Sequence, residues 1–182
     1  MKKSIKAIED SRDWRAAIHL LETIDESSVT LNLRVMFILV DLLVDGQYSD
    51  EEGDYASDSL LKIFKYSEDK FAQNAEFMFF TGIMAYIGEW LFGMENVESA
   101  RILLANALEL EPDNVLYKWG YISRTDQRIE ENSLLKLELS ENILLKNSDV
   151  ILWLSQRGLL GEYVLGNIQS SYNQLRELLY KS

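Results

Sequence analysis

The chain has 182 residues, an ordinary length for one domain, and its 30 acidic and 18 basic residues give a net charge of −12. It has no cysteine and a single histidine, which excludes disulfides, thiolate metal sites, cysteine nucleophiles and mechanisms that use two histidines. A nucleic-acid-binding surface needs a basic footprint, whereas this acidic balance favours a basic protein partner.

Apolar residues at helical spacing predict helices along the whole chain. Ser11 is the expected cap of the first helix, Gly46 ends the second, and Pro112 opens the helix that follows it. The polar, acidic stretch 46–54 is interpreted as a loop. The expected helices cover residues 11–25, 29–45, 55–66, 71–92, 96–111, 113–124, 129–145, 148–159 and 163–180.

Two segments bear on whether the chain meets a membrane. Residues 77–94 are the most apolar stretch, but they are short for a span, carry Glu89 and lack basic flanks, so we expect a buried helix. Residues 1–10 mix charged and apolar side chains and give no export signal. Together with the absence of cysteine, these features predict a cytoplasmic protein without a membrane segment.

The stretch 134–139 alternates leucine with polar residues and would also suit a strand, but its helical neighbours favour helix. No convincing hairpin or βαβ pattern occurs elsewhere. The sequence therefore predicts an all-α fold in a single domain over residues 1–182.

The segment 81–114 has small residues and a proline at a distinctive spacing. Gly88 precedes Ala100 by twelve residues, Ala107 follows seven later, and Pro112 five after that. This pattern resembles the tetratricopeptide repeat family, a helix–turn–helix unit of about 34 residues. Small residues at these places allow close helix crossing, so we expect Gly88 to be where the first helix approaches the second.

The specific resemblance covers about a quarter of the chain, and units elsewhere depart from it. Ala17 and Ala56 match the small position of the second helix, but their spacing to Ala100 requires insertions, and neither unit has the proline. The resemblance implies antiparallel helix pairs stacked as a short tetratricopeptide-like solenoid with degenerate ends, a single helical-repeat domain.

No motif for catalysis, cofactor binding or metal binding stands out. His19 lies beside the apolar stripe of its helix and has no nucleophile motif nearby, so we expect it at the surface. Asp50 to Asp54 lacks the ligand spacing of a calcium loop, and the adjacent acids Glu130 and Glu131 cannot converge on one substrate atom. We expect no enzyme activity, no cofactor and no metal.

The acidic charge is concentrated near the middle of the first half. Residues 25–69 hold eleven acids and three basic residues, a net of −8. Insertions in repeat proteins gather on one face, often the binding face, and exposed aromatics anchor partners. An alternative is an ordinary solvated surface. The expected partner-binding residues are Asp50, Glu51, Glu52, Asp54, Asp58, Tyr48 and Tyr55.

The remaining aromatic residues mostly fit core positions of stacked helices. These expected core residues are Trp90, Trp119, Trp153, Phe79, Phe80 and Tyr86, while Tyr121 is a further candidate anchor for a partner.

Three functions from different classes remain open. The first is a toxin-immunity protein of the bacterial kind, a small acidic blocker of a basic toxin such as a nuclease, for which fast association is an advantage. The second is a tetratricopeptide-like adaptor that holds a peptide or partner helix in its concave face. The third is an enzyme on an all-helical scaffold that uses scattered carboxylates. A basic partner that loses its own activity on binding would distinguish the first.

Overall fold

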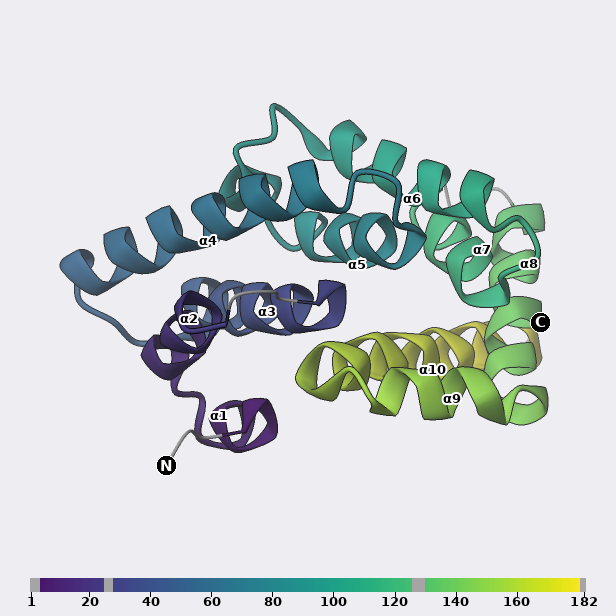
Figure 1. Cartoon of the computed structure of the whole chain (residues 1–182). Coiled ribbons are helices and arrows are strands. Elements are labelled where there is room, and N and C mark those ends of the chain that lie inside the picture. The colour runs from purple at the N-terminus through teal and green to yellow at the C-terminus, as the bar shows by residue number, and fades with distance from the viewer. Residues whose placement is uncertain (1–3, 25–27, 126–129, 181–182) are drawn as a thin grey trace.

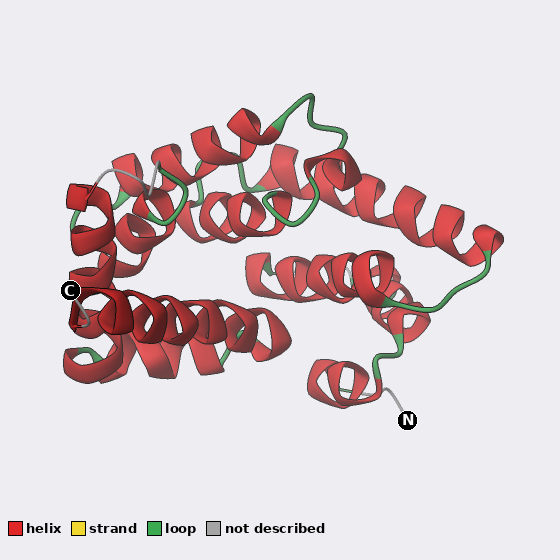
Figure 2. Cartoon of the chain, turned by 180° about the vertical axis from the view of Figure 1, so that it is seen from behind, coloured by secondary structure: helices red, strands yellow, loops and turns green. Residues whose placement is uncertain are grey.

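The computed structural model describes residues 4–24, 28–125 and 130–180, without the side chains of 178–180. Within these ranges every regular element is helical, so the predicted all-α class is confirmed (Figure 2). The elements are α1 (Ile5–Ser11), α2 (Trp14–Glu22), α3 (Val29–Asp45), α4 (Asp50–Lys70), α5 (Ala75–Ala85), the 3₁₀ turn η1 (Glu89–Phe92), α6 (Val97–Leu110), α7 (Val115–Ile122), α8 (Glu130–Glu141), the π-helical turn η2 (Asn142–Lys146), α9 (Ser148–Ser155) and α10 (Gly158–Tyr180).

Most helices begin at a residue whose side chain accepts a hydrogen bond from the first turn. Ser4, Asp13, Ser28 and Ser49 do this for α1 to α4, and asparagines do it for α5, α6, α7 and α9. These caps satisfy backbone N–H groups that have no partner within the helix. The expectation that Ser11 caps the first helix is wrong, because Ser11 ends α1 and its hydroxyl donates to the Ala7 carbonyl at 2.9 Å.

Several predicted boundaries shift in the structure. The stretch 46–54 is not wholly loop, because α4 begins at Asp50, and the predicted helix 71–92 is broken after Ala85. Pro112 lies in the turn between α6 and α7, whose cap is Asn114, rather than at the start of a helix. Residues 25 and 129, at the ends of two predicted helices, lie outside the described ranges.

The most extensive contact between two helices of the described residues is between α5 and α6, in the segment that resembles a tetratricopeptide repeat. Ala100, Leu104 and Ala107 of α6 are fully buried there. The glycine at the crossing is Gly82, where an added Cβ would lie 2.8 Å from Leu104 Cγ and 3.1 Å from the Ala100 carbonyl oxygen. Gly88, the expected residue, instead has extended backbone (φ −170°) after the end of α5.

Consecutive helices fold back on one another, and α4 to α7 lie along one side of the molecule while α9 and α10 lie along the other (Figure 1). The start of α10 also packs against α3 and α1, so helices far apart in the sequence are in contact. In a strict solenoid, each unit contacts only its neighbours. Glu9 of α1 marks this junction, because its carboxylate pairs with Arg34 of α3 and lies against Gly158 of α10.

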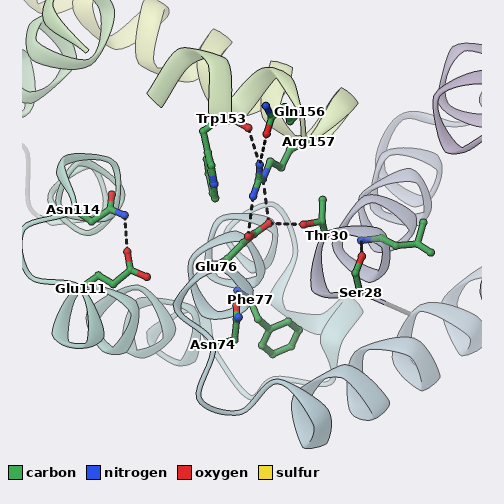
Figure 3. Close-up of polar contacts among 11 residues, drawn as sticks. Ser28, Thr30, Asn74, Glu76, Phe77, Glu111, Asn114, Trp153, Gln156 and Arg157 are labelled. Atoms are coloured by element: carbon green, nitrogen blue, oxygen red, sulfur yellow. Dashed lines mark hydrogen bonds and ion pairs between the residues drawn. The ribbon is translucent and has the colours of Figure 1, made fainter. Parts of the chain in front are cut away.

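A second ionic link joins α3, α5 and the α9–α10 turn. The Glu76 carboxylate accepts two hydrogen bonds from the Arg157 guanidinium, at 3.0 and 3.1 Å, and one from the Thr30 hydroxyl at 3.0 Å (Figure 3). Arg157 also lies 3.8 Å from the centre of the Trp153 ring. The Glu76 and Arg157 side chains are only 15% and 11% exposed, so this pair is shielded from solvent.

The core contains most of the aromatic residues that the sequence assigned to it. Phe79, Phe80 and Trp119 are buried, and Trp153 is partly buried and stacked on Phe80. Trp90 is the exception, because it lies on η1 with 65% of its surface exposed. The break after Ala85 turns this side chain away from the core.

Candidate protein-binding surface

The first turn of α4 carries three of the predicted binding residues, and one of them has a structural role. Ser49 Oγ accepts a hydrogen bond from the Glu52 N–H at 3.3 Å, and the Glu52 carboxylate accepts one from the Ser49 N–H at 3.0 Å. Arg15 of α2 donates to the same carboxylate at 2.7 Å. The bond from the Ser49 backbone, followed by the bond from Arg15, lowers the pKa of Glu52. Glu52 therefore holds the helix start and α2 together.

The other four acids of the predicted site are directed to solvent. Asp50, Glu51, Asp54 and Asp58 are exposed, and none of them forms an ion pair with a described residue. Asp25 and Glu26, the first two acids of the charged segment, lie outside the described ranges. The N-terminal half of α4 thus presents uncompensated negative charge, which attracts a basic surface at long range.

An apolar groove of 580 Å³ runs between this helix, α2 and α3. Six of its lining residues are aliphatic or aromatic, and three are charged: Glu22, Asp58 and Lys62. Tyr55 and Tyr66, about three turns apart on α4, are 52% and 50% exposed. The lining residues are Ile18, Leu21, Glu22, Ile24, Asn32, Tyr55, Asp58, Ser59, Lys62, Ile63 and Tyr66.

The α4 helix has two distinct faces that explain this groove. Gly53, Ala56, Leu60, Phe64 and Ser67 form its buried face. The groove residues of α4, from Tyr55 to Tyr66, follow a parallel stripe at helical spacing. Tyr55 is supported from below by Trp14, with ring centroids 5.9 Å apart. Packing therefore holds Tyr55, while Tyr66 is contacted by Lys70, whose Nζ donates to its hydroxyl at 3.2 Å, and both rings remain accessible to a partner.

Tyr48 has a structural role rather than a place in the groove. Its hydroxyl donates to the Leu43 carbonyl at 2.9 Å, and its ring covers Gly53 so closely that an added Cβ would lie 2.6 Å from the ring. It closes the α3–α4 connection. Of the seven predicted residues, the structure brings Tyr55 and Asp58 to the groove and leaves Asp50, Glu51 and Asp54 beside it on the exposed end of α4.

The sequence did not reveal that Lys62, Ile63 and Tyr66 of α4 form one surface with Leu21 of α2 and with Ile24, which follows α2. The spacing of Tyr55, Ser59, Lys62 and Tyr66 at intervals of four, three and four residues is a helical stripe. The prediction of a loop over residues 46–54 places Tyr55 at the start of a helix, and this hides the stripe. In the structure α4 begins at Asp50, so Tyr55 lies within the helix.

The described residues contain no cluster of three or more histidine, cysteine or acidic side chains placed to hold a metal ion. His19 is exposed as expected, and its Nδ1 lies 3.8 Å from the Glu22 carboxylate. None of the helices in the described ranges has the length and apolar character needed to cross a membrane. The chain matches no protein-family model, no curated protein and no solved structure.

Proposed function

We propose that the chain is a non-enzymatic protein-binding module whose α2–α4 groove and adjacent acidic end of α4 receive a basic protein. The role we assign is that of an immunity protein, which neutralises a basic toxin such as a nuclease. One observation carries the proposal: two half-exposed tyrosines in an apolar groove lie on the same helix as four carboxylates that form no ion pair with a described residue. Aromatic anchors with charged surroundings are typical of protein interfaces.

The division of labour within this surface follows from physical chemistry. Tyr55 and Tyr66 have large apolar areas and few rotatable bonds, so burying them against a partner gains contact area at a low entropic cost. The carboxylates at the rim act mainly on the rate of encounter and its salt dependence. An acidic blocker that meets its basic target quickly suits the task of neutralisation.

The proposal includes two features predicted from the sequence. One is a cytoplasmic location, where toxin and blocker would meet. The other is tetratricopeptide-like stacking of the helix pairs, for which the buried alanines of α6 against Gly82 of α5 are the supporting contact.

A second candidate function is an adaptor that binds a peptide or partner helix. The position of the groove between helices favours this function, because amphipathic helices commonly bind with their apolar face in a hydrophobic groove. The two candidates differ in what binding does to the partner. An adaptor leaves the partner's activity intact, whereas an immunity protein abolishes it.

The first test is whether the chain, purified with its partner from the source cells, suppresses the partner's activity. We expect a basic protein that is held at low salt and inhibited when bound. Replacing both groove tyrosines (Tyr55→Ala with Tyr66→Ala) should weaken binding at least tenfold with little change in helix content. An inhibited partner whose affinity is unchanged in this variant would contradict the groove assignment.

A second test isolates the acidic end of α4. Asp50→Asn, Glu51→Gln, Asp54→Asn and Asp58→Asn together should slow association and flatten its salt dependence, because rim charges steer encounter. Glu52 is kept, since it caps the helix. The matched control neutralises four exposed acids elsewhere, Glu109, Asp113, Glu138 and Glu162. If the two variants associate at equal rates at both low and high ionic strength, the α4 acids have no role in binding and are an ordinary solvated surface.

A further inference from the structure

A second pocket, of 390 Å³, lies where the N-terminal ends of α5, α7 and α9 meet. It is separate from the α2–α4 groove and shares no lining residue with it. Figure 3 shows Glu111 and Asn114 on one side and Glu76, Arg157 and Trp153 on the other. The lining residues are Asn74, Ala75, Glu76, Glu111, Asn114, Leu116, Tyr117, Asp149, Val150 and Trp153.

The pocket offers acceptors rather than donors. The side-chain oxygens of Asn74, Asn114 and Asn147 already accept from the N–H groups of the first turns of α5, α7 and α9, at 2.8 to 3.3 Å. Those helix ends therefore have fewer free N–H groups for an anion. Arg157, a cation near the pocket, is engaged by Glu76.

Two carboxylates at the pocket have no cationic partner among the described residues. Glu111 accepts a hydrogen bond from Asn114 Nδ2 at 2.9 Å, which is a neutral group. Asp149, in the first turn of α9, forms no ion pair. With Glu76 neutralised by Arg157, these two acids leave the pocket with uncompensated negative charge.

Tyr117 supplies an independent indication of a ligand. The residue is only 3% exposed, lines the pocket, and its hydroxyl forms no hydrogen bond with any described residue. The hydroxyl oxygen itself is not fully buried, so a donor that enters the pocket can reach it. Burial, and next the charges of Glu111 and Glu76, raise the pKa of Tyr117. The phenol stays protonated and presents an oxygen that can accept a hydrogen bond.

We propose that this pocket binds an arginine side chain of the partner protein. The inference rests on the proposed function, since it assumes a basic protein partner. A guanidinium is a planar group with five N–H donors and a permanent charge, and it forms paired hydrogen bonds with carboxylates. Glu111 and Asp149 supply the carboxylates, and the Tyr117 oxygen accepts a further N–H.

The experiment uses the whole chain labelled with ¹⁵N and titrates it with N-acetyl-argininamide, which mimics an arginine within a protein. We expect saturable shifts of the amide signals of residues 111–117 and 149–153, with a dissociation constant on the order of 1 mM. The paired variant Glu111→Gln with Asp149→Asn should weaken binding at least tenfold. The matched control, Glu109→Gln with Asp113→Asn, removes two exposed acids that do not line the pocket and should bind normally.

The variant Tyr117→Phe tests the phenol separately. Its hydroxyl has no partner in the described structure, so the variant should keep the urea midpoint of the parent and yet bind N-acetyl-argininamide three- to tenfold more weakly. Unchanged binding with unchanged stability would remove Tyr117 from the site.

Three further probes decide what the pocket recognises. Equal binding of N-acetyl-citrullinamide, which has the same shape without the charge, overturns the proposal, as does equal binding of N-acetyl-lysinamide. Free L-arginine that binds more than tenfold tighter would identify a free amino acid as the ligand and overturn a protein source. These titrations need no partner. Their failure, with the α4 results intact, would refute this pocket and leave the proposed function standing.

Discussion

Two buried side chains have a hydroxyl group that forms no hydrogen bond with a described residue. The hydroxyls of Ser67 in α4 and Thr81 in α5 are fully buried and have no hydrogen-bond partner among the described residues. Leaving a buried hydroxyl unpaired costs about 1–3 kcal/mol, because its bonds to water are lost and not replaced. These positions are therefore places where a less polar residue would fit the protein better.

Thr81→Val should raise the free energy of unfolding by about 1 kcal/mol, since it keeps the side-chain shape and removes the unpaired hydroxyl. Urea denaturation followed by circular dichroism measures the change. The matched control is Thr30→Val, which removes a hydroxyl that donates to Glu76 at 3.0 Å and should lower stability. A lower midpoint for the Thr81 variant would mean that its hydroxyl has a partner after all.

Ala107 tests the close packing of α6 against its neighbours. The residue is fully buried, so Ala107→Leu forces extra atoms into a filled crossing and should cost about 1–3 kcal/mol of stability. Ala105→Leu, at a partly buried position of the same helix, is the control and should cost less. Chemical denaturation that finds both variants equally stable would show that the crossing has spare room.

At the scale of single elements, the start of α4 depends on the reciprocal bonds between Ser49 and Glu52. Ser49→Ala should cost about 1 kcal/mol, the usual value for losing an N-terminal cap. The measurement is the urea midpoint at neutral pH. Asp50→Ala, which changes a neighbouring exposed residue outside this pair of bonds, serves as the control, and an equal loss in both would argue against the cap.

The same element gives a pH dependence with a definite sign. The pKa of Glu52 is lowered from its ordinary value of 4.5, so the folded protein favours the charged form. Its contribution to stability is present above pH 4.5 and disappears as the pH falls through the lowered folded-state pKa. Urea midpoints of the parent and Glu52→Gln should therefore differ at pH 7 and approach each other as the pH falls through the lowered pKa of Glu52. Glu51→Gln should show no such convergence.

The helices were largely predictable because their apolar stripes are local features of the sequence. The predicted helix 29–45 coincides with α3, and 96–111 differs from α6 by one residue at each end. The break after Ala85 was not predictable in this way, since the apolar run continues to Phe92. Both Gly82 and Gly88 lie in that run, and only the crossing with α6 distinguishes them.

The candidate site was predictable only in part. Its charge and Tyr55 lie within one stretch of sequence, so composition was enough to find them. The groove also needs Leu21 of α2 and Ile24 just after it, and the second pocket needs Glu76, Tyr117 and Asp149 from three different helices. Contacts between residues of different helices depend on tertiary packing, and the periodicity within one helix does not predict them.

At the scale of the whole molecule, the Glu76–Arg157 pair joins α5 to the α9–α10 turn, 81 residues later in the chain. Because the pair is shielded from solvent, removing one partner leaves a buried charge and should cost about 3–5 kcal/mol. We expect Glu76→Gln and Arg157→Met to be strongly destabilising alone, and the double variant to lose much less than their sum.

A double-mutant cycle by urea denaturation measures this coupling. Additive losses would show that the two side chains act independently. Lys6→Met provides the comparison, since Lys6 and Asp10 form an exposed pair within one helix and its loss should hardly change the midpoint.

The contact of α10 with α1 and α3 has a kinetic consequence. Nearest-neighbour contacts in a linear array form quickly and can be lost one unit at a time from either end. Here the start of α10 packs against helices that precede it by more than a hundred residues in the sequence. These contacts raise the contact order, so we expect them to slow folding. Once made, the junction couples both halves in one cooperative transition. A substitution at Gly158 would push against the Glu9 carboxylate and so disturb its pairing with Arg34 of α3. Because α3 forms one wall of the α2–α4 groove, the change would reach the groove although no α10 residue lines that groove.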